Sequence, residues 1–162
     1  MEYAERVTAF AGRQGITYHY AAGRALSYFY QKLRDERRIF GNRCPKCGNV
    51  FVPPIDFCRT CFVEVPNSWV AVSDKGELWS YSVILKTFVG YMRKPPWVYA
   101  QIKLDGADDY FYHIVLGANP DKLDIGMRVE AVWAKERGRV SDIGGILEEI
   151  AYFRPAEEWR RA

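Results

Sequence analysis

All four cysteines of the 162-residue chain lie in one short segment, at Cys44, Cys47, Cys58 and Cys61. Their spacing is C-x2-C-x10-C-x2-C. Two cysteines separated by two residues can direct both sulfurs at one ion from a tight turn, and two such turns complete a tetrahedral site of four sulfurs. The pattern therefore predicts a structural metal centre. Zinc is the favoured ion, and iron, which accepts the same four-sulfur geometry, is the alternative.

The two cysteine pairs differ in the residue that follows each of them. Gly48 follows the first pair, where a turn around a metal often needs a residue without a side chain. Phe62 follows the second pair, so we expect the second turn to be less regular. A redox pair and disulfides are the competing interpretations. Two matched C-x2-C pairs disfavour a redox pair, and a reducing cytoplasm disfavours disulfides. If all four thiolates hold a metal, no cysteine remains as a nucleophile.

The other residues do not form a recognisable catalytic set. The two histidines, His19 and His113, lie in separate extended stretches, where a lone histidine is more often packed or exposed than catalytic. Neither a Ser-His-Asp arrangement nor a Gly-rich phosphate loop can be placed in the sequence. The acidic residues of "DKGE", "DGADD" and "SDIGG" fit turns better than they fit carboxylate pairs.

The segments around the cysteines predict a mainly β protein with one helix before the metal segment. Residues 25–38, "ALSYFYQKLRDERR", place apolar and aromatic residues at helical spacing opposite charged ones. After the cysteines, alternating or β-branched runs separated by turn residues indicate about five short strands. Such a series predicts a small antiparallel barrel of OB-fold size, with "PDKLDIGM" as a short helical turn between strands.

The expected organisation is an N-terminal arm (1–22), an amphipathic helix (23–40), a metal ribbon (41–66) and a barrel domain (67–162). A hydrophobic share of 49% and an aromatic share of 15% suit a packed globular protein. The net charge of +3 does not by itself indicate nucleic acid. The start of the chain has no long apolar run, so we expect no signal peptide, no membrane span and a cytoplasmic protein.

Aromatic and charged residues supply the candidate binding surfaces. The aromatic residues of the barrel segment either pack in the core and at an interface, which we favour, or stack nucleic-acid bases. They are Trp69, Trp79, Tyr81, Trp97, Tyr99, Tyr110, Tyr112 and Trp133. Asp105, Asp108 and Asp109 lie in one turn between strands, and they would repel phosphates if that turn borders the binding face. The charged helix face is either solvated or a basic lip for a phosphate-bearing ligand. It carries Lys32, Arg34, Arg37 and Arg38.

The whole pattern resembles the DUF35 family, whose members pair a rubredoxin-like zinc ribbon with a C-terminal OB-fold. The matching stretches are "SYFYQKLRDERRIFGNRCPKCGNVFVPPIDFCRTC", "GELWSYSVI", "PPWVYAQIKLDGA" and "LDIGMRVEAVW", within about residues 23–155. The cysteine stretch is the specific part of the match, because many small barrels share such strands. The arm, residues 1–22, departs from the family pattern and leaves the exact partner open.

The resemblance implies a non-catalytic subunit of a hetero-oligomer, in which a thiolase-fold partner acting on acyl-CoA carries the catalytic residues. Thiolases, hydroxymethylglutaryl-CoA synthase assemblies and aldolases are such partners, and benzoylsuccinyl-CoA thiolase with its small zinc-containing subunit is one setting. A CoA ester is then a ligand of the complex, and its anionic diphosphate suits Arg and Lys side chains. The candidate contacts are Arg37, Arg38, Arg43, Lys46, Arg93 and Lys94. The alternative function is a zinc ribbon and OB-fold module that binds single-stranded nucleic acid.

Overall fold

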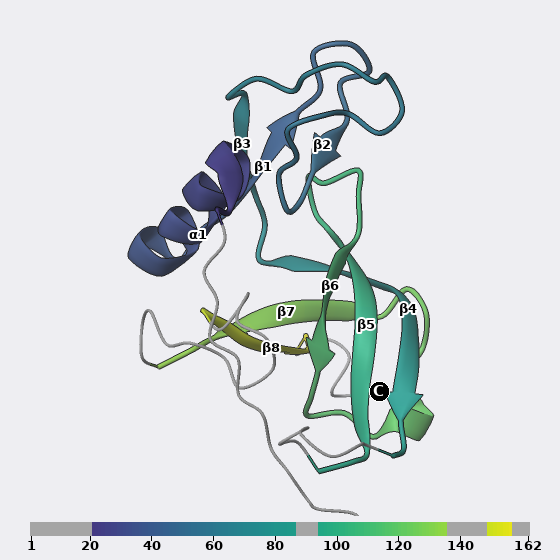
Figure 1. The fold of residues 1–162 in the computed structure, drawn as a ribbon. Coiled ribbons are helices and arrows are strands. Elements are labelled where there is room, and N and C mark those ends of the chain that lie inside the picture. The colour runs from purple at the N-terminus through teal and green to yellow at the C-terminus, as the bar shows by residue number, and fades with distance from the viewer. Residues whose placement is uncertain (1–20, 87–93, 136–148, 157–162) are drawn as a thin grey trace, which may run out of the picture.

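Two sheets and one helix form the part of the chain that the computed structural model describes, residues 21–86, 94–135 and 149–156. The elements, labelled in Figure 1, are α1 (Gly23–Glu36), β1 (Ile39–Arg43), β2 (Val50–Phe51), β3 (Trp69–Val72), β4 (Lys75–Ile84), β5 (Trp97–Leu104), β6 (Phe111–Val115), the 3-10 helix η1 (Pro120–Lys122), β7 (Arg128–Trp133) and β8 (Ile150–Pro155). The predicted fold class, mainly β with an N-terminal helix, a ribbon and an OB-type barrel, is confirmed.

Several expectations fall outside these residues. Residues 1–20 of the expected arm, with His19, and Arg93 of the expected basic loop are not among those described. Among the described residues, no helix is long and apolar enough to cross a membrane. The division of the chain into four segments stays a prediction.

A three-stranded antiparallel sheet in the order β2-β1-β3 forms the body of the ribbon, by which we mean residues 39–72. Gly41 of β1 allows β2 to approach closely, because a Cβ atom there would lie 2.5 Å from the carbonyl oxygen of Phe51. Asn42 is buried beside it, where its side-chain amide donates to the Ile55 carbonyl at 2.7 Å and accepts from the Ile55 N–H at 3.1 Å. The strand β3, which opens the predicted barrel segment, therefore belongs to the ribbon sheet.

The other five strands close into a barrel in the order β4-β5-β6-β8-β7, in which only the pairing of β6 with β8 is parallel among the described strands. Closure leaves no free sheet edge. Alternate side chains point inward, and the interior is filled by fully buried residues such as Leu78, Ile102, Phe111 and Phe153. The helical turn predicted between strands is present as η1.

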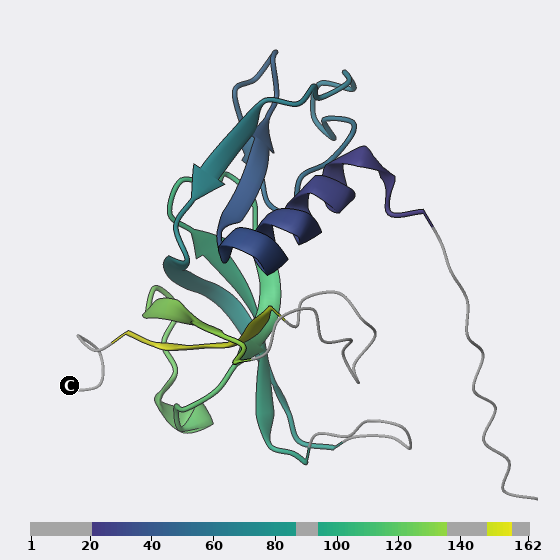
Figure 2. The ribbon, with the colours of Figure 1, turned by 90° about the vertical axis from the view of Figure 1, so that its left-hand side faces the viewer.

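The helix α1 lies across the region where the ribbon sheet meets the barrel (Figure 2). Phe29 and Leu33, four residues apart on one helical face, are fully buried in the main core. Tyr28 stacks on Trp69 of β3 with ring centroids 4.0 Å apart. The helix ends two residues earlier than expected, because Arg37 adopts a left-handed conformation with φ 52° and its N–H donates to the Leu33 carbonyl.

The acidic turn between β5 and β6 fastens the ribbon to the barrel. The Asp108 carboxylate accepts the backbone N–H of Val50 at 2.9 Å, and the Asp108 N–H donates to the Val50 carbonyl at 2.9 Å. Asp109 forms an ion pair with Arg59 of the ribbon. These carboxylates are therefore engaged by groups far away in the sequence.

Candidate metal centre

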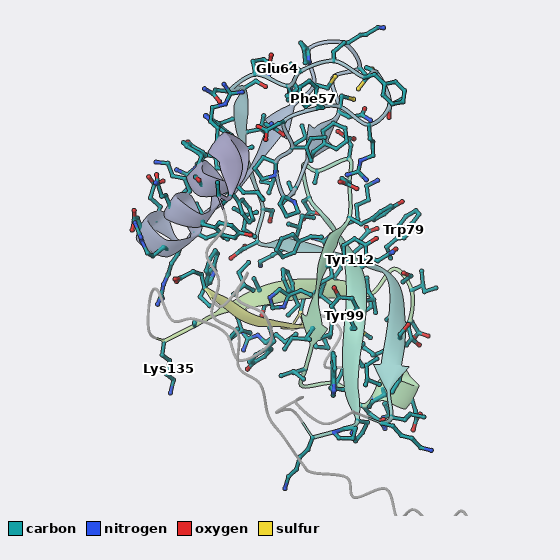
Figure 3. All side chains as sticks on the ribbon, viewed as in Figure 1. Phe57, Glu64, Trp79, Tyr99, Tyr112 and Lys135 are labelled. Carbon is teal, nitrogen blue, oxygen red and sulfur yellow. The ribbon has the colours of Figure 1, made fainter. Side chains whose placement is uncertain are left out.

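The four cysteine sulfurs converge in the ribbon, and Figure 3 draws sulfur atoms in yellow at the end of the ribbon away from the barrel. All four Sγ atoms lie within 4.8 Å of one another, and the Sγ atoms of Cys47 and Cys58 are 3.8 Å apart. A zinc ion with Zn–S bonds of about 2.3 Å needs tetrahedral sulfurs separated by about 3.8 Å. All four cysteines are free thiols, so the disulfide interpretation does not apply. The donor set and its geometry fit Zn²⁺.

The two cysteine turns share one backbone geometry. In the first knuckle, residues 44–48, the N–H of Gly48 donates to the Cys44 carbonyl at 3.0 Å. In the second knuckle, residues 58–62, the N–H of Phe62 donates to the Cys58 carbonyl at 2.9 Å. Both final residues have positive φ, 78° for Gly48 and 54° for Phe62. The expectation of a less regular second turn is therefore wrong, and Phe62 occupies a left-handed position at a cost of roughly 1–2 kcal/mol.

Backbone amides point at the sulfurs and make the thiols unequal. The N–H groups of Lys46 and Cys61 lie 3.4 Å from the sulfurs of Cys44 and Cys58, respectively. The backbone N–H of Cys47 is the main cause that lowers the pKa of Cys44 to about 6. Burial is the main cause that raises the pKa of Cys61 to about 12. A bound cation favours the thiolate of every ligand, so metal binding at neutral pH would release protons from this site.

A small apolar cluster supports the knuckles from inside. It consists of the buried residues Cys44, Phe51, Cys58 and Val65, with Ile55, Cys61 and Val63 packed against it. Phe57 and Phe62, which flank the second cysteine pair, are not in this cluster. Phe57 is 65% exposed and Phe62 is 85% exposed.

The basic residues predicted at the end of the helix have different surroundings. Arg37 is half-buried, and its guanidinium donates to the carbonyl of Ala134 at 2.7 Å, so it links the helix to the end of β7. Arg38 is exposed, and its guanidinium lies over the ring of Phe40 at 5.2 Å from the centroid. Arg37 therefore has a structural contact that the sequence did not indicate.

The remaining predicted cations do not form a single site. Arg43 and Lys46 are exposed beside the first knuckle, and Arg43 donates to the carbonyl of Gly48 at 2.9 Å. Lys94 is exposed just before β5, which starts at the barrel end away from the ribbon (Figure 1). The structure thus brings Arg43 and Lys46 to the same knuckle and separates both from Lys94.

His113 lies inside the barrel. Its side chain is 9% exposed, with the rings of Phe111 and Phe153 at centroid distances of 6.0 and 5.6 Å. Of the two alternatives to a catalytic role, packed or exposed, the structure shows the packed one.

Aromatic side chains gather on the outer face of β4, β5 and β6 (Figure 3). We call Trp79, Tyr99, Tyr110 and Tyr112 the aromatic face. Trp79 is 46% exposed, Tyr99 45% and Tyr112 47%. Their rings pair across strands, with centroid distances of 5.3 Å for Trp79–Tyr110 and 6.2 Å for Tyr99–Tyr112. Gln101 donates to the Tyr112 hydroxyl at 2.9 Å and helps to orient it.

The sequence indicated only part of this face. The alternation in "WVYAQIKL" places Tyr99 opposite the buried residues of the same strand. In β4 the alternation of buried Leu78 with its exposed neighbours places Trp79 outward in the same way. The ring contacts Trp79–Tyr110 and Tyr99–Tyr112 depend on which strands are neighbours, and alternation within one strand does not indicate that.

A zinc ribbon with four cysteines joined to a closed five-stranded barrel defines the class of protein. Comparison with family models agrees: residues 32–66 match the rubredoxin-like zinc ribbon domain of ChsH2, and residues 69–134 match the C-terminal OB-fold domain of ChsH2. The chain is similar to a DUF35 domain-containing scaffold protein of Methanothermobacter thermautotrophicus, with 32% identity over 126 residues that cover 78% of this chain and 92% of the relative. The chain belongs to the DUF35 family, which confirms the resemblance.

Three further proteins are similar to this chain. A DUF35 domain-containing scaffold protein of Methanocaldococcus jannaschii is 27% identical over 128 residues, which cover 79% of this chain and 89% of the relative. The solved structure of an Ltp2-ChsH2(DUF35) aldolase aligns with a TM-score of 0.58 and 23% identity, covering 85% of this chain and 98% of that chain. A DUF35 protein of unknown function from Sulfolobus solfataricus aligns with a TM-score of 0.53 and 24% identity, covering 65% of this chain and 75% of that chain. The structural likenesses show a shared fold.

Proposed function

We propose that this chain is a non-catalytic, zinc-containing subunit that assembles with a thiolase-fold enzyme acting on acyl-CoA. In this proposal Cys44, Cys47, Cys58 and Cys61 hold the zinc ion and have a structural role. No thiolate then remains as a nucleophile, so the partner performs the acyl-group chemistry. The relatives named scaffold proteins, and the shared fold with the ChsH2(DUF35) chain of an aldolase, support a role in assembly.

The aromatic face is the observation that carries this proposal. Tyr and Trp are enriched at the centres of protein interfaces, because they bury a large area with few rotatable bonds. Trp79, Tyr99 and Tyr112 expose close to half of their surface on one rigid barrel wall. Ring pairing and the hydrogen bond from Gln101 hold the side chains in place before any partner binds, which lowers the entropy cost of association.

We further propose that the exposed cations near the first knuckle contact the diphosphate of a CoA ester in the assembled complex. None of the ion pairs within the described residues involves Arg43 or Lys46, and both are exposed. A guanidinium or ammonium without a carboxylate partner is available for a phosphate. Arg43→Glu in the assembled complex should weaken CoA-ester binding several-fold, and unchanged affinity would leave these residues as ordinary surface charge.

Binding of single-stranded nucleic acid is the alternative function, because the outer face of the equivalent OB-fold strands binds oligonucleotides in other proteins. A polyanion also needs a basic groove along the stacked bases. On the described aromatic face, Lys103 lies over Trp79 at 5.8 Å, whereas the nearby Arg59 is paired with Asp109. This charge balance favours a protein partner.

Affinity purification of the tagged chain from its native host, followed by mass spectrometry, tests the proposal. We expect a thiolase-fold protein in near-stoichiometric amount. The double variant Trp79→Ala/Tyr112→Ala should lose it, whereas Ile125→Ala, which removes an even more exposed apolar side chain elsewhere, should retain it. Salt-sensitive recovery of single-stranded nucleic acid without a protein partner would instead support the alternative.

A further inference from the structure

Phe62 has a backbone conformation and an exposure that its own packing does not explain. It takes the left-handed position that Gly48 takes in the first knuckle, with φ 54° against 78°. A Cβ atom at Gly48 would have no neighbour within 4 Å, so a side chain would fit there. Glycine is favoured at this position because of the left-handed backbone conformation. Phe62 accepts the same conformation while its side chain stays 85% exposed. Strained residues of this kind concentrate at functional positions.

The second knuckle holds its phenylalanines on a rigid support. The N–H of Cys58 donates to the carbonyl of Val63 at 2.9 Å, and the N–H of Phe62 returns to the carbonyl of Cys58 at 2.9 Å. Phe57, 65% exposed, precedes the cysteine pair and forms a bridge with Glu64. Neither phenylalanine belongs to the apolar cluster of the ribbon. A fixed backbone that presents unburied aromatic rings is pre-organised for insertion into another surface.

The charges around the second knuckle are balanced. Glu64 pairs with Arg24 at 3.2 Å, and Arg59 pairs with Asp109. A membrane-binding surface carries an excess of Lys and Arg, and a nucleic-acid surface carries a basic groove. A rim of mixed charge around exposed aromatic residues is instead the composition of a protein interface.

We propose that Phe57 and Phe62 form an anchor that inserts into an apolar pocket of a partner protein. Following the proposed function, on which this identification of the partner rests, the pocket belongs to the thiolase-fold subunit. Figure 3 places Phe57 on the ribbon and Trp79 on the barrel, so the anchor is a second contact region separate from the aromatic face. The second knuckle holds Phe62 in a strained conformation because this conformation points the ring at the partner.

Site-specific photocrosslinking in the native host tests the anchor on the full chain. Phe62→p-benzoylphenylalanine places the photoreactive group at the anchor. Tyr112→p-benzoylphenylalanine samples the aromatic face, and Ile125→p-benzoylphenylalanine is the control at an exposed apolar residue. We expect position 62 to give one discrete adduct, identified by mass spectrometry as a thiolase-fold protein, and position 125 to give none.

The outcomes separate the anchor from the proposed function. An adduct at position 112 without one at position 62 overturns the anchor and leaves the proposed function intact. A single identified adduct at position 62 with a protein of another fold supports the anchor and overturns the thiolase-fold assignment. An adduct between two copies of this chain, or no protein adduct at either position, overturns the anchor.

The variant Phe62→Gly separates a role in partner binding from a role in stability, because the two roles predict different changes in the thermal midpoint and in partner recovery. Glycine relieves the left-handed strain but adds freedom to the unfolded chain. The thermal midpoint of the zinc-loaded chain should therefore be unchanged or higher by up to about 2–4 °C. At the same time, recovery of the partner should fall at least tenfold at unchanged zinc content. A lower thermal midpoint with full partner recovery would show that Phe62 stabilises the fold, and would overturn the proposal.

Discussion

The metal end of the ribbon and the barrel are stabilised in different ways. The barrel belongs to a large apolar cluster that also includes Phe29 and Leu33 of the helix. The knuckles have a cluster of four buried residues, two of which are cysteines. Burial of apolar surface can hold the first region together, whereas so small a cluster needs a metal or another covalent restraint. The comparison teaches that the barrel, the helix and the base of the ribbon share one apolar interior, which includes Ile39, Val50 and Val52, and that the knuckles depend on the four thiolates.

The largest expected effect comes from removing one metal ligand. Cys58→Ser should abolish zinc binding, because structural zinc contributes about 10–16 kcal/mol in comparable small sites. Hydrogen exchange should show lost protection over residues 44–66 and retained protection in β4–β8. The control Thr60→Ser, at an exposed position between two cysteines, should keep one zinc per chain. Unchanged zinc content in Cys58→Ser would contradict the assignment of the site.

A large cavity in the barrel should lower the stability of the barrel and leave zinc binding intact. Phe153 is fully buried and packs against Phe111 at a centroid distance of 6.0 Å. Phe153→Ala should lower the free energy of unfolding by about 3–5 kcal/mol, as measured by urea denaturation. Zinc content should stay at the wild-type value at 20 °C, and Ile125→Ala, at a 69% exposed position, should change stability by less than about 0.5 kcal/mol. Loss of zinc from folded Phe153→Ala would show that the two regions are not separately stabilised.

Asn42 connects the ribbon sheet to the segment between the knuckles and should have an intermediate effect. Asn42→Ala leaves the half-buried N–H and carbonyl of Ile55 without their side-chain partners. We expect a loss of about 1–3 kcal/mol and faster zinc transfer to a competing chelator. Asn67→Ala, at an exposed position in the ribbon, is the matched control. If both variants transfer zinc to the chelator at the same rate, the two hydrogen bonds between Asn42 and Ile55 do not stabilise the metal site.

The smallest expected effect belongs to a surface pair on the barrel. The side-chain hydrogen bond from Arg128, 2.8 Å long, lowers the pKa of Asp105. Because the folded-state pKa is the lower one, the pair stabilises the fold above the unfolded value of about 3.9. This contribution is lost as the pH falls through the folded value. Asp105→Asn should cost at most about 1 kcal/mol at pH 7, and the difference from wild type should vanish below the folded-state pKa of Asp105 and shrink in high salt. A difference that persists in acid would exclude the ion pair as its cause.

The sequence predicted the metal centre because ligand spacing is a local property. The pairs Cys44/Cys47 and Cys58/Cys61 need only two tight turns to meet. The same local view failed at Phe62, where we took the missing glycine as a sign of irregularity. The backbone hydrogen bond of the second knuckle, Phe62 N–H to Cys58 carbonyl, shows that the turn geometry persists without glycine.

Contacts between distant segments were not predictable from local patterns. The acids of the turn between β5 and β6 were identified from the sequence, but their partners were not: Asp109 meets Arg59, 50 residues away in sequence. Likewise, the pairing of β3 with β1 joins the start of the expected barrel segment to the ribbon sheet. The pattern of a strand indicates which of its residues face the core. Only the pairing between strands shows which strand lies beside it.

Reconstitution of acyl-CoA turnover tests the central claim most directly. The chain, the thiolase-fold protein that co-purifies with it, and their stoichiometric mixture would each be assayed with the acyl-CoA substrate of the complex. The account predicts that the zinc-loaded chain alone gives no turnover and that adding it to the partner raises turnover. Turnover by the isolated chain at the rate of the mixture would contradict the proposal that this chain is a non-catalytic subunit.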